Sequence, residues 1–409
     1  MDTRERFLEV MKFNTGVRSL KWEFGYWGQT LNNWYASGLP RKAYIDIPSE
    51  IVTPTSGLYT TVWSFLPKGD LPKGYPAMGG GLYWPTQGFA LDHDVKDYFG
   101  MDEVQRLVDV NLLLHPMFEP KILEEDEKYI VYIDVDGVKR RFIKETATMP
   151  ASEAFPIKDR RSWEKIKAER INFEDVSGRF PPNWNELVKE YRNRTYPLAL
   201  GGYPHGFFGT PAHLMGYANL FYNYYDDPGL IHDIVSTFTD LWIAVYDEVL
   251  KDVDVDHVQI WEDISFGKGP MVSPAMIKEF MVPYYKRFTD FVRGRGIEVI
   301  LVDTDGYCFD IIPLFIEGGV TGMYPIEVSC GMDLMKVRMT FPRLKLMGGI
   351  PKLEIAKGKK RIDKILEPVK KMLKFGGYIP FGDHLIPPEV HWKEFKYYRE
   401  TLNRMLEKK

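Results

Sequence analysis

Short apolar segments alternate with longer amphipathic ones in the second half of the chain, over residues 196–409. The apolar segments are rich in Val, Ile and Leu, which is typical of strands buried on both faces of a parallel sheet. We expect strands at 198–202, 257–261, 298–302, 322–326, 344–349 and 378–381. The regular alternation predicts an α/β fold built from repeated strand–helix units.

Amphipathic segments between these strands predict helices, which we place at 214–225, 230–250, 274–293, 309–316 and 334–339. A last helix is expected to end near Gly376 and Gly377. No Gly-x-Gly-x-x-Gly motif joins a strand to a helix, so the pattern favours a closed (β/α)8 TIM barrel over an open dinucleotide-binding sheet. The open sheet stays the alternative.

The first 195 residues have a different pattern and predict an elaborated N-terminal part of the same single domain, residues 1–409. Thr3 is placed to cap a helix that runs through Phe7 and Met11. Glycine-rich aromatic stretches follow, and we expect them to be irregular segments that cover a pocket. Residues 129–143 form two β-rich runs joined by Asp-Gly, which predicts a hairpin.

Composition and charge narrow the class of protein. Hydrophobic residues make up 44% of the chain, enough for a large core, and the net charge of −4 gives no reason to expect a nucleic-acid partner. The basic stretch 357–374 is predicted to be the solvated face of a helix. The two cysteines, the charged N-terminus and the lack of a long apolar run favour a cytoplasmic protein outside the membrane.

Polar side chains follow one predicted strand after another. Catalytic groups of TIM barrels lie just past the carboxyl ends of the strands, so these residues are candidates for an active site. They are His205, Glu262, Asp263, Asp303, Asp305, Glu327, Cys330, Lys352, Asp383 and His384.

Several candidates also have a purely structural interpretation. His205 suits a packed core position, Asp305 with Gly306 suits a turn, and Glu262 suits a helix cap. A lone cysteine such as Cys330 is more often inert. His384 is the most suggestive, because a neighbouring carboxylate suits both metal binding and proton transfer.

The chain resembles the uroporphyrinogen decarboxylase superfamily of (β/α)8 barrels over nearly its whole length. The resemblance rests on the order and spacing of short motifs at residues 3–7, 226–228, 262–263, 273–274, 325–327, 348–352 and 383–384. True decarboxylases of the superfamily carry arginines that grip the carboxylates of a tetrapyrrole. The corresponding residues 27–34 are aromatic and uncharged here, which argues against that activity.

Zinc methyltransferases of the superfamily hold the metal with a His-x-Cys pair and a later Cys. The resemblance places Asp303 and Asp305 at the first two ligand positions and His384 at the third. Cys330 is a further candidate ligand that would supply sulfur. Two carboxylates and an imidazole suit a divalent metal, so zinc is the expected cofactor.

The resemblance extends to the corrinoid-dependent O-demethylating methyltransferases. It implies transfer of a methyl group from a methoxylated aromatic compound to the Co(I) corrinoid of a separate carrier protein. Catalytic roles then fall on Glu262, Asp303, Asp305, Glu327 and His384. Substrate contacts fall on Trp27, Trp34, Tyr83, Trp84 and His205.

Three other functions remain open. Methyl transfer from a corrinoid to a thiol such as coenzyme M would require thiol-activating Cys ligands. Decarboxylation of a tetrapyrrole or a smaller acid would require an arginine cluster in the barrel mouth. A barrel without catalytic activity would serve only to dock a corrinoid carrier. Relatives in the superfamily often pair their barrels, so a homodimer is a possible assembly.

Overall fold

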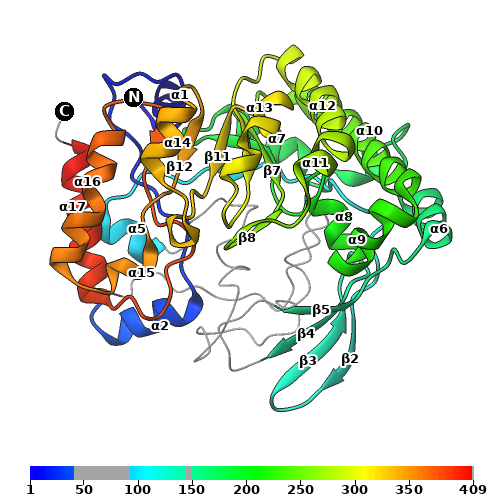
Figure 1. Cartoon of the computed structure of the whole chain (residues 1–409), viewed down its shortest axis with the longest axis horizontal. Helices are drawn as coiled ribbons and strands as arrows, with labels where there is room; N and C mark the ends of the chain where they lie inside the picture. The colour runs from blue at the N-terminus through cyan, green and yellow to red at the C-terminus, as the bar shows by residue number, and fades with distance from the viewer. Residues whose placement is uncertain (41–92, 144–149, 408–409) are drawn as a thin grey trace.

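A seven-stranded parallel sheet forms the centre of the molecule (Figure 1). The computed structural model describes residues 1–40, 93–143 and 150–407. In sheet order the strands are β1 (Arg106–Leu107), β6 (Leu198–Gly201), β7 (His257–Trp261), β10 (Ile300–Asp303), β11 (Gly322–Tyr324), β12 (Lys345–Met347) and β13 (Tyr378–Ile379). Sequence order and sheet order agree, as expected of a TIM-barrel-like α/β fold.

An extended segment at residues 19–26 joins the two edges of this sheet. On the β13 side, the Ser19 hydroxyl donates a hydrogen bond of 2.7 Å to the carbonyl of Tyr378. On the β1 side, the Lys21 carbonyl accepts a 3.3 Å hydrogen bond from the backbone of Asp102. The curled sheet is therefore completed by a segment whose aromatic residues were expected to cover a pocket.

Those aromatic residues instead fill the interior of the barrel. Trp22 and Phe24 are buried in one cluster with Leu301, which points inward from β10. Ile300, the preceding residue on β10, belongs to the separate cluster between the sheet and its helices, as the alternation of a strand requires. Helix α1 (Thr3–Met11) closes the end of the barrel at which the strands begin, and the Phe7 ring lies 5.8 Å from that of Trp22.

The cap of α1 differs from the prediction. Asp2, not Thr3, is the N-cap residue, and its carboxylate accepts a hydrogen bond from the backbone of Glu5. The Glu5 side chain reaches back to the backbone of Asp2, which completes a capping box. Thr3 is the first residue of the helix and is buried.

Helices surround the sheet (Figure 1). In the repeat region they are α8 (Gly209–Met215), α9 (Tyr217–Asp226), α10 (Pro228–Asp252), α11 (Pro274–Phe280), α12 (Val282–Gly294), α13 (Ile312–Glu317), α14 (Leu334–Thr340), α15 (Lys352–Ile355), α16 (Lys359–Met372) and α17 (Trp392–Glu407). Before the repeats lie α2 (Gly28–Ala36), α5 (His93–Phe99), α6 (Arg160–Arg170) and α7 (Trp184–Arg192).

Three helix predictions need correction. The helix predicted at 214–225 is divided at Gly216, whose φ of +77° is left-handed. The one at 274–293 is divided at Met281, because Pro283 lacks the N–H that a continuous helix would use. The helix predicted to be last is α16, and a further helix, α17, packs against it.

The predicted hairpin at 129–143 is confirmed and belongs to a larger sheet. Strands β3 (Tyr129–Ile133) and β4 (Lys139–Ile143) are antiparallel, and Gly137 takes a φ of +80° in the turn. Strands β2 (Lys121–Glu125) and β5 (Ala151–Ala154) extend the sheet on either side. Figure 1 shows this sheet projecting beyond α8 and α9. A second short hairpin, β8 (Ser265–Phe266) with β9 (Gly269–Pro270), follows β7.

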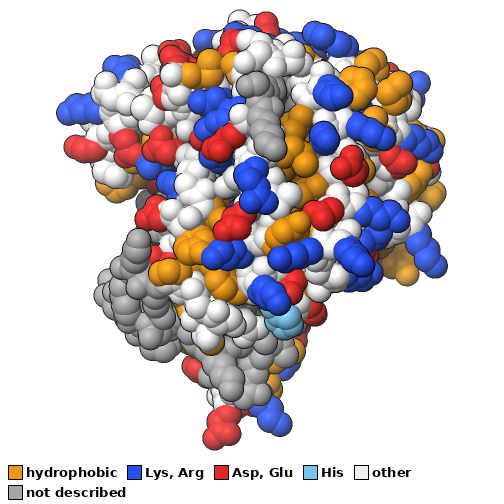
Figure 2. Space-filling model, turned by 90° about the vertical axis from the view of Figure 1, so that its left-hand side faces the viewer, with side chains coloured by type: hydrophobic (Ala, Val, Ile, Leu, Met, Phe, Trp, Pro, Cys, Tyr) orange, Lys and Arg blue, Asp and Glu red, His pale blue; other side chains and the backbone are white. Residues whose placement is uncertain are grey.

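The face next to α16 and α17 carries mixed charge (Figure 2). Lys and Arg side chains are interspersed with Asp and Glu on it. The lysines of α16 are exposed while Ile362, Leu366 and Val369 are buried, so the basic stretch is a solvated helix face as predicted. Among the described residues, no helix combines the length and the apolar content that a membrane span requires.

Candidate active site

The predicted carboxylates and His384 come together at the carboxyl ends of the strands. Asp303 is the last residue of β10, and Glu327 lies in the loop after β11. His384 lies in the loop after β13. The strands are parallel, so all three loops lie at one end of the barrel.

An ion pair joins two of the predicted residues. Nε2 of His384 lies 3.3 Å from Oδ2 of Asp305, and the His384 ring packs 4.9 Å from the ring of Phe24. Burial alone would lower the pKa of His384, but the Asp305 carboxylate raises it above its ordinary value. Burial would likewise raise the pKa of Asp305, and His384 with Lys352 holds it below its usual range. Both effects favour a charged pair.

Asp263 is a carboxyl group whose pKa this pair influences. Its φ is +45°, a left-handed conformation that is uncommon for a residue other than glycine. Burial and the Asp305 carboxylate raise its pKa to about 8, although His384 acts in the opposite direction. Asp263 therefore holds its proton at neutral pH.

Asp303 is a second carboxyl group whose pKa is raised. It faces the barrel interior, on the same side of β10 as Leu301, and is buried. Burial and the nearby carboxylates of Asp305 and Asp263 raise its pKa well above the usual range. The pKa values of Asp263 and Asp303 are thus raised and that of Asp305 is lowered at one end of the barrel.

Glu327 belongs to a hydrogen-bonded group beside these acids. It accepts hydrogen bonds from the Lys352 ammonium at 3.1 Å and from the backbone of Gly306 at 2.8 Å. Asp383 accepts from the backbone of Lys352 at 2.9 Å and from the hydroxyl of Ser329 at 2.6 Å. These contacts fix the loops after β10, β11 and β13 relative to one another.

A cavity of about 270 Å³ adjoins the acids. Asp263, Asp305 and Glu327 contribute its polar wall. Tyr217 and Phe266 supply aromatic surface, and both side chains are largely exposed. The remaining lining residues are Ser265, Gly267, Met271, Gly306 and Cys330. The cavity is small and combines ring-sized apolar surface with carboxyl groups.

Glu262, a predicted catalytic residue, lies apart from this cavity. It is fully buried and accepts hydrogen bonds from the backbones of Phe207, Phe208 and Gly209 at 2.7–3.0 Å and from the Tyr285 hydroxyl. Burial raises the pKa of Glu262 to about 7, although these hydrogen bonds act to lower it. Its observed contacts anchor the loop between β6 and α8.

Two predicted substrate contacts are core residues in the structure. The His205 ring packs 4.2 Å from that of Trp242, and burial lowers its pKa to about 3. Trp34 stacks at 4.2 Å on Phe395, and its indole N–H donates to the carbonyl of Val390. Neither side chain lines the cavity, because each is enclosed by other aromatic rings.

The other predicted aromatic contacts differ among themselves. Trp27 is half-buried just before α2 and packs against the interior cluster near the mouth. Tyr83 and Trp84 lie outside the described residues. The described aromatic residues that line the cavity are Tyr217 and Phe266, which the sequence did not single out. Their position, at the start of α9 and in β8, is the only signal that would have pointed to them.

The expected zinc ligands do not form a ready set in the described part of the chain. No group of three or more His, Cys, Asp or Glu side chains there is arranged to hold a metal ion. His384 is occupied by Asp305, and burial with Glu327 nearby raises the pKa of the Cys330 thiol to about 12. The described side chains thus show no arranged set of zinc ligands. Zinc stays a prediction.

The fold and the site together are typical of barrel enzymes that carry acidic residues at the carboxyl ends of their strands. The family model described as "Uroporphyrinogen decarboxylase (URO-D)" matches residues 141–405. The chain therefore belongs to the uroporphyrinogen decarboxylase family. Among solved structures, it is similar to a methyltransferase from Methanosarcina mazei, with a TM-score of 0.56 and 13% sequence identity. That alignment covers 98% of this chain and 99% of the other. A search of curated protein sequences found no match.

Proposed function

We propose that the chain is a methyltransferase that moves the methyl group of a methoxylated aromatic compound to the corrinoid of a separate carrier protein. The observation that carries the proposal is a cavity lined by the carboxyl groups of Asp263 and Asp305 and by the aromatic rings of Tyr217 and Phe266. Burial and the Asp305 carboxylate raise the pKa of Asp263, which favours its protonated form. The similarity in fold to a methyltransferase agrees with it.

The chemistry of an aryl methyl ether explains why a neutral acid is needed. Transfer of the methyl group breaks the bond between the methyl carbon and the ether oxygen, and both electrons stay on the oxygen. A phenolate is a poor leaving group, so a proton delivered to that oxygen lowers the barrier. Asp263, with a pKa of about 8, would donate this proton and become a carboxylate.

The neighbouring groups suit this role. Burial and the Asp305 carboxylate favour the proton on Asp263 before the reaction. After the proton has left, His384 lies close enough to stabilise the new carboxylate, since its charge already lowers the pKa of Asp263. Tyr217 and Phe266 would bind the aromatic ring by stacking.

The corrinoid of the carrier protein would supply the Co(I) nucleophile that accepts the methyl group. The residues of this chain would bind the ring, orient the ether oxygen toward Asp263 and protonate it. The exposed side chains of Tyr217 and Phe266 leave the cavity accessible from outside the barrel, where a carrier must approach.

The decarboxylase alternative finds less support at this cavity. A tetrapyrrole with several carboxylates requires several guanidinium or ammonium partners. The described lining of the cavity contains no Arg or Lys, and Lys352 beside it is already paired with Glu327. Methyl transfer to a thiol is also less well supported, because Asp305 and His384 occupy positions at which the resemblance implies thiol-activating Cys ligands.

The test is a pH–rate profile of O-demethylation with the purified chain, a reduced corrinoid protein and a panel of methoxybenzoates. We expect kcat/KM to fall above pH 8 as Asp263 loses its proton. Asp263→Asn should lower the rate by about 100-fold or more and remove that limb. Loss of activity with an unchanged pH limb would contradict the role of Asp263. No demethylation of any methoxyaromatic would overturn the function itself.

A further inference from the structure

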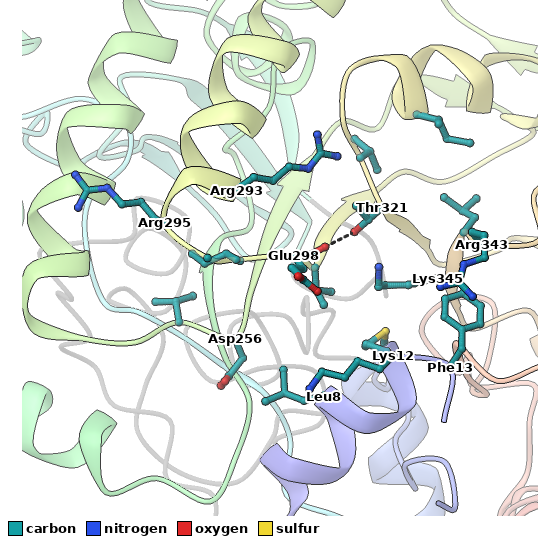
Figure 3. Close-up of a pocket in the computed structure, with 18 of the residues that line it drawn as sticks. Leu8, Lys12, Phe13, Asp256, Arg293, Arg295, Glu298, Thr321, Arg343 and Lys345 are labelled. Atoms are coloured by element: carbon teal, nitrogen blue, oxygen red, sulfur yellow. Dashed lines mark hydrogen bonds between the residues drawn. The ribbon is translucent and has the colours of Figure 1, made fainter. Parts of the chain in front are cut away.

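A second, larger cavity lies at the opposite end of the barrel. It has a volume of about 1370 Å³ and is enclosed by the end of α1, the end of α12 and the starts of β10, β11 and β12 (Figure 3). Its lining includes Val299, Thr321 and Lys345, each at or just before the beginning of a strand. The acids of the candidate active site lie at the other ends of these strands, so the two cavities are separate.

Unpaired positive charge distinguishes this cavity. Lys12 from α1, Arg343 and Lys345 line it, and Lys345 is half-buried. Within the described ranges, neither Arg343 nor Lys345 forms an ion pair with a carboxylate. The Arg343 guanidinium instead lies 4.7 Å from the centre of the Phe13 ring. The Lys12 ammonium pairs with the carboxylate of Glu9, on its own helix, at 3.7 Å.

The other cations of the lining already have partners. Arg4 pairs with Asp256 at 2.7 Å, and Arg295 pairs with Asp247 on α10. Figure 3 shows the Arg295 guanidinium turned away from the centre of the cavity. Arg293 donates to the carbonyl of Gly319 at 2.5 Å. A carbonyl does not neutralise a guanidinium, so the lining cations that pair with no carboxylate among the described residues are Arg293, Arg343 and Lys345.

Glu298 is the carboxylate that faces these cations. It lies between α12 and Lys345 in Figure 3, and its backbone carbonyl accepts a 3.0 Å hydrogen bond from Thr321. Burial lowers the pKa of Lys345, and Arg343 and Arg293 add to this effect against the attraction of Glu298. Outside the Arg4–Asp256 pair, the lining carboxylates are Glu298 and the exposed Asp254, which leave an excess of one positive charge.

We propose that this cavity binds a small polyanion that carries phosphate groups. Arginine offers paired N–H donors to a phosphate and lysine offers a point charge, and both come from the short segment 343–345. The volume leaves room for a ligand with two or more such groups. Bound there, it would connect α1 to β12 and stabilise the end of the barrel at which the strands begin.

Isothermal titration calorimetry of the intact chain with tripolyphosphate at low salt tests the proposal. We expect one site per chain. Lys345→Gln should weaken binding by about tenfold or more, since it removes a half-buried charge. Glu298→Gln should strengthen binding, because it removes the opposing carboxylate. The exposed Lys364 of α16 provides the control, and Lys364→Gln should leave the affinity unchanged.

Three results would overturn the proposal. The first is no binding of tripolyphosphate by the folded chain. The second is an equal loss with Lys345→Gln and Lys364→Gln, which would indicate non-specific attraction. The third is binding of citrate in preference to tripolyphosphate, which would make the ligand a polycarboxylate. If Lys345→Gln fails to fold, the predicted gain with Glu298→Gln still decides the question.

Discussion

Replacement of Asp263 by Asn tests the electrostatics of the site without any substrate. The folded chain binds the Asp263 proton with a pKa of about 8, whereas an unfolded Asp has a pKa near ~3.9. A raised pKa favours folding most below the unfolded value, and this contribution is lost as pH rises toward the folded value. Asn mimics the protonated acid, so the variant should escape that loss.

The pKa difference sets the size of the effect. About four pKa units correspond to ~5.5 kcal/mol at most, at ~1.4 kcal/mol per unit. Asp263 borders a solvent-accessible cavity, and screening reduces the effect, so we expect about 2 kcal/mol between pH 5 and pH 8.5. Urea unfolding of both proteins at the two pH values measures it. The exposed Asp290 of α12 gives the control, Asp290→Asn.

The expected result is an advantage of Asp263→Asn over the unmodified chain that grows with pH, with no such trend for Asp290→Asn. A constant difference across this pH range would refute the reasoning. So would a wild-type chain that gains stability relative to the variant as pH rises, because that sign requires a lowered pKa.

Other predictions concern the architecture around the site. Glu262→Ala would leave three buried backbone N–H groups without an acceptor, so we expect a loss of about 3 kcal/mol or more in urea unfolding; a loss below ~1 kcal/mol would contradict the anchoring role. Gly206→Ala would place a Cβ 1.8 Å from the carbonyl oxygen of Trp261, and we expect a large fall in Tm; an unchanged Tm would show that the loop is free to move. Asp136→Asn weakens the hydrogen bond of 2.9 Å to Nε2 of His213, which lies between the projecting sheet and the barrel, and hydrogen exchange should rise in β3 and β4; unchanged protection would exclude this contact as their attachment.

Most of the sheet could be predicted because its strands are continuous apolar runs. β7 was predicted with its observed bounds, since Val258, Ile260 and Trp261 lie in a short β-rich run between the acidic residues that flank it. Helix ends were less accurate, because Pro283 and Gly216 interrupt helices whose apolar periodicity continues across them. Helix α17 was missed although Phe395 and Leu402 follow a helical spacing.

The sequence predicts where the candidate site lies, but not which of its carboxyl groups have raised pKa values or what surrounds each side chain. Asp303, Asp305 and His384 were found because they directly follow strands, and parallel strands bring such residues to one end. Asp263 also follows a strand, but its protonated state depends on burial and on Asp305, which no local pattern encodes. Glu262 directly precedes Asp263 in the same loop after β7. Its surroundings differ from those of Asp263, because its side chain points into the loop before α8.

The most direct test of the proposed function is the absorbance of the methylated corrinoid. The purified chain, a reduced corrinoid protein and a methoxybenzoate are incubated without oxygen. The proposal predicts that the methylated form and one equivalent of the phenol appear together at pH 7, and that Asp263→Asn slows both by about 100-fold. Confirmed corrinoid reduction with no methylated form from any methoxyaromatic would contradict it.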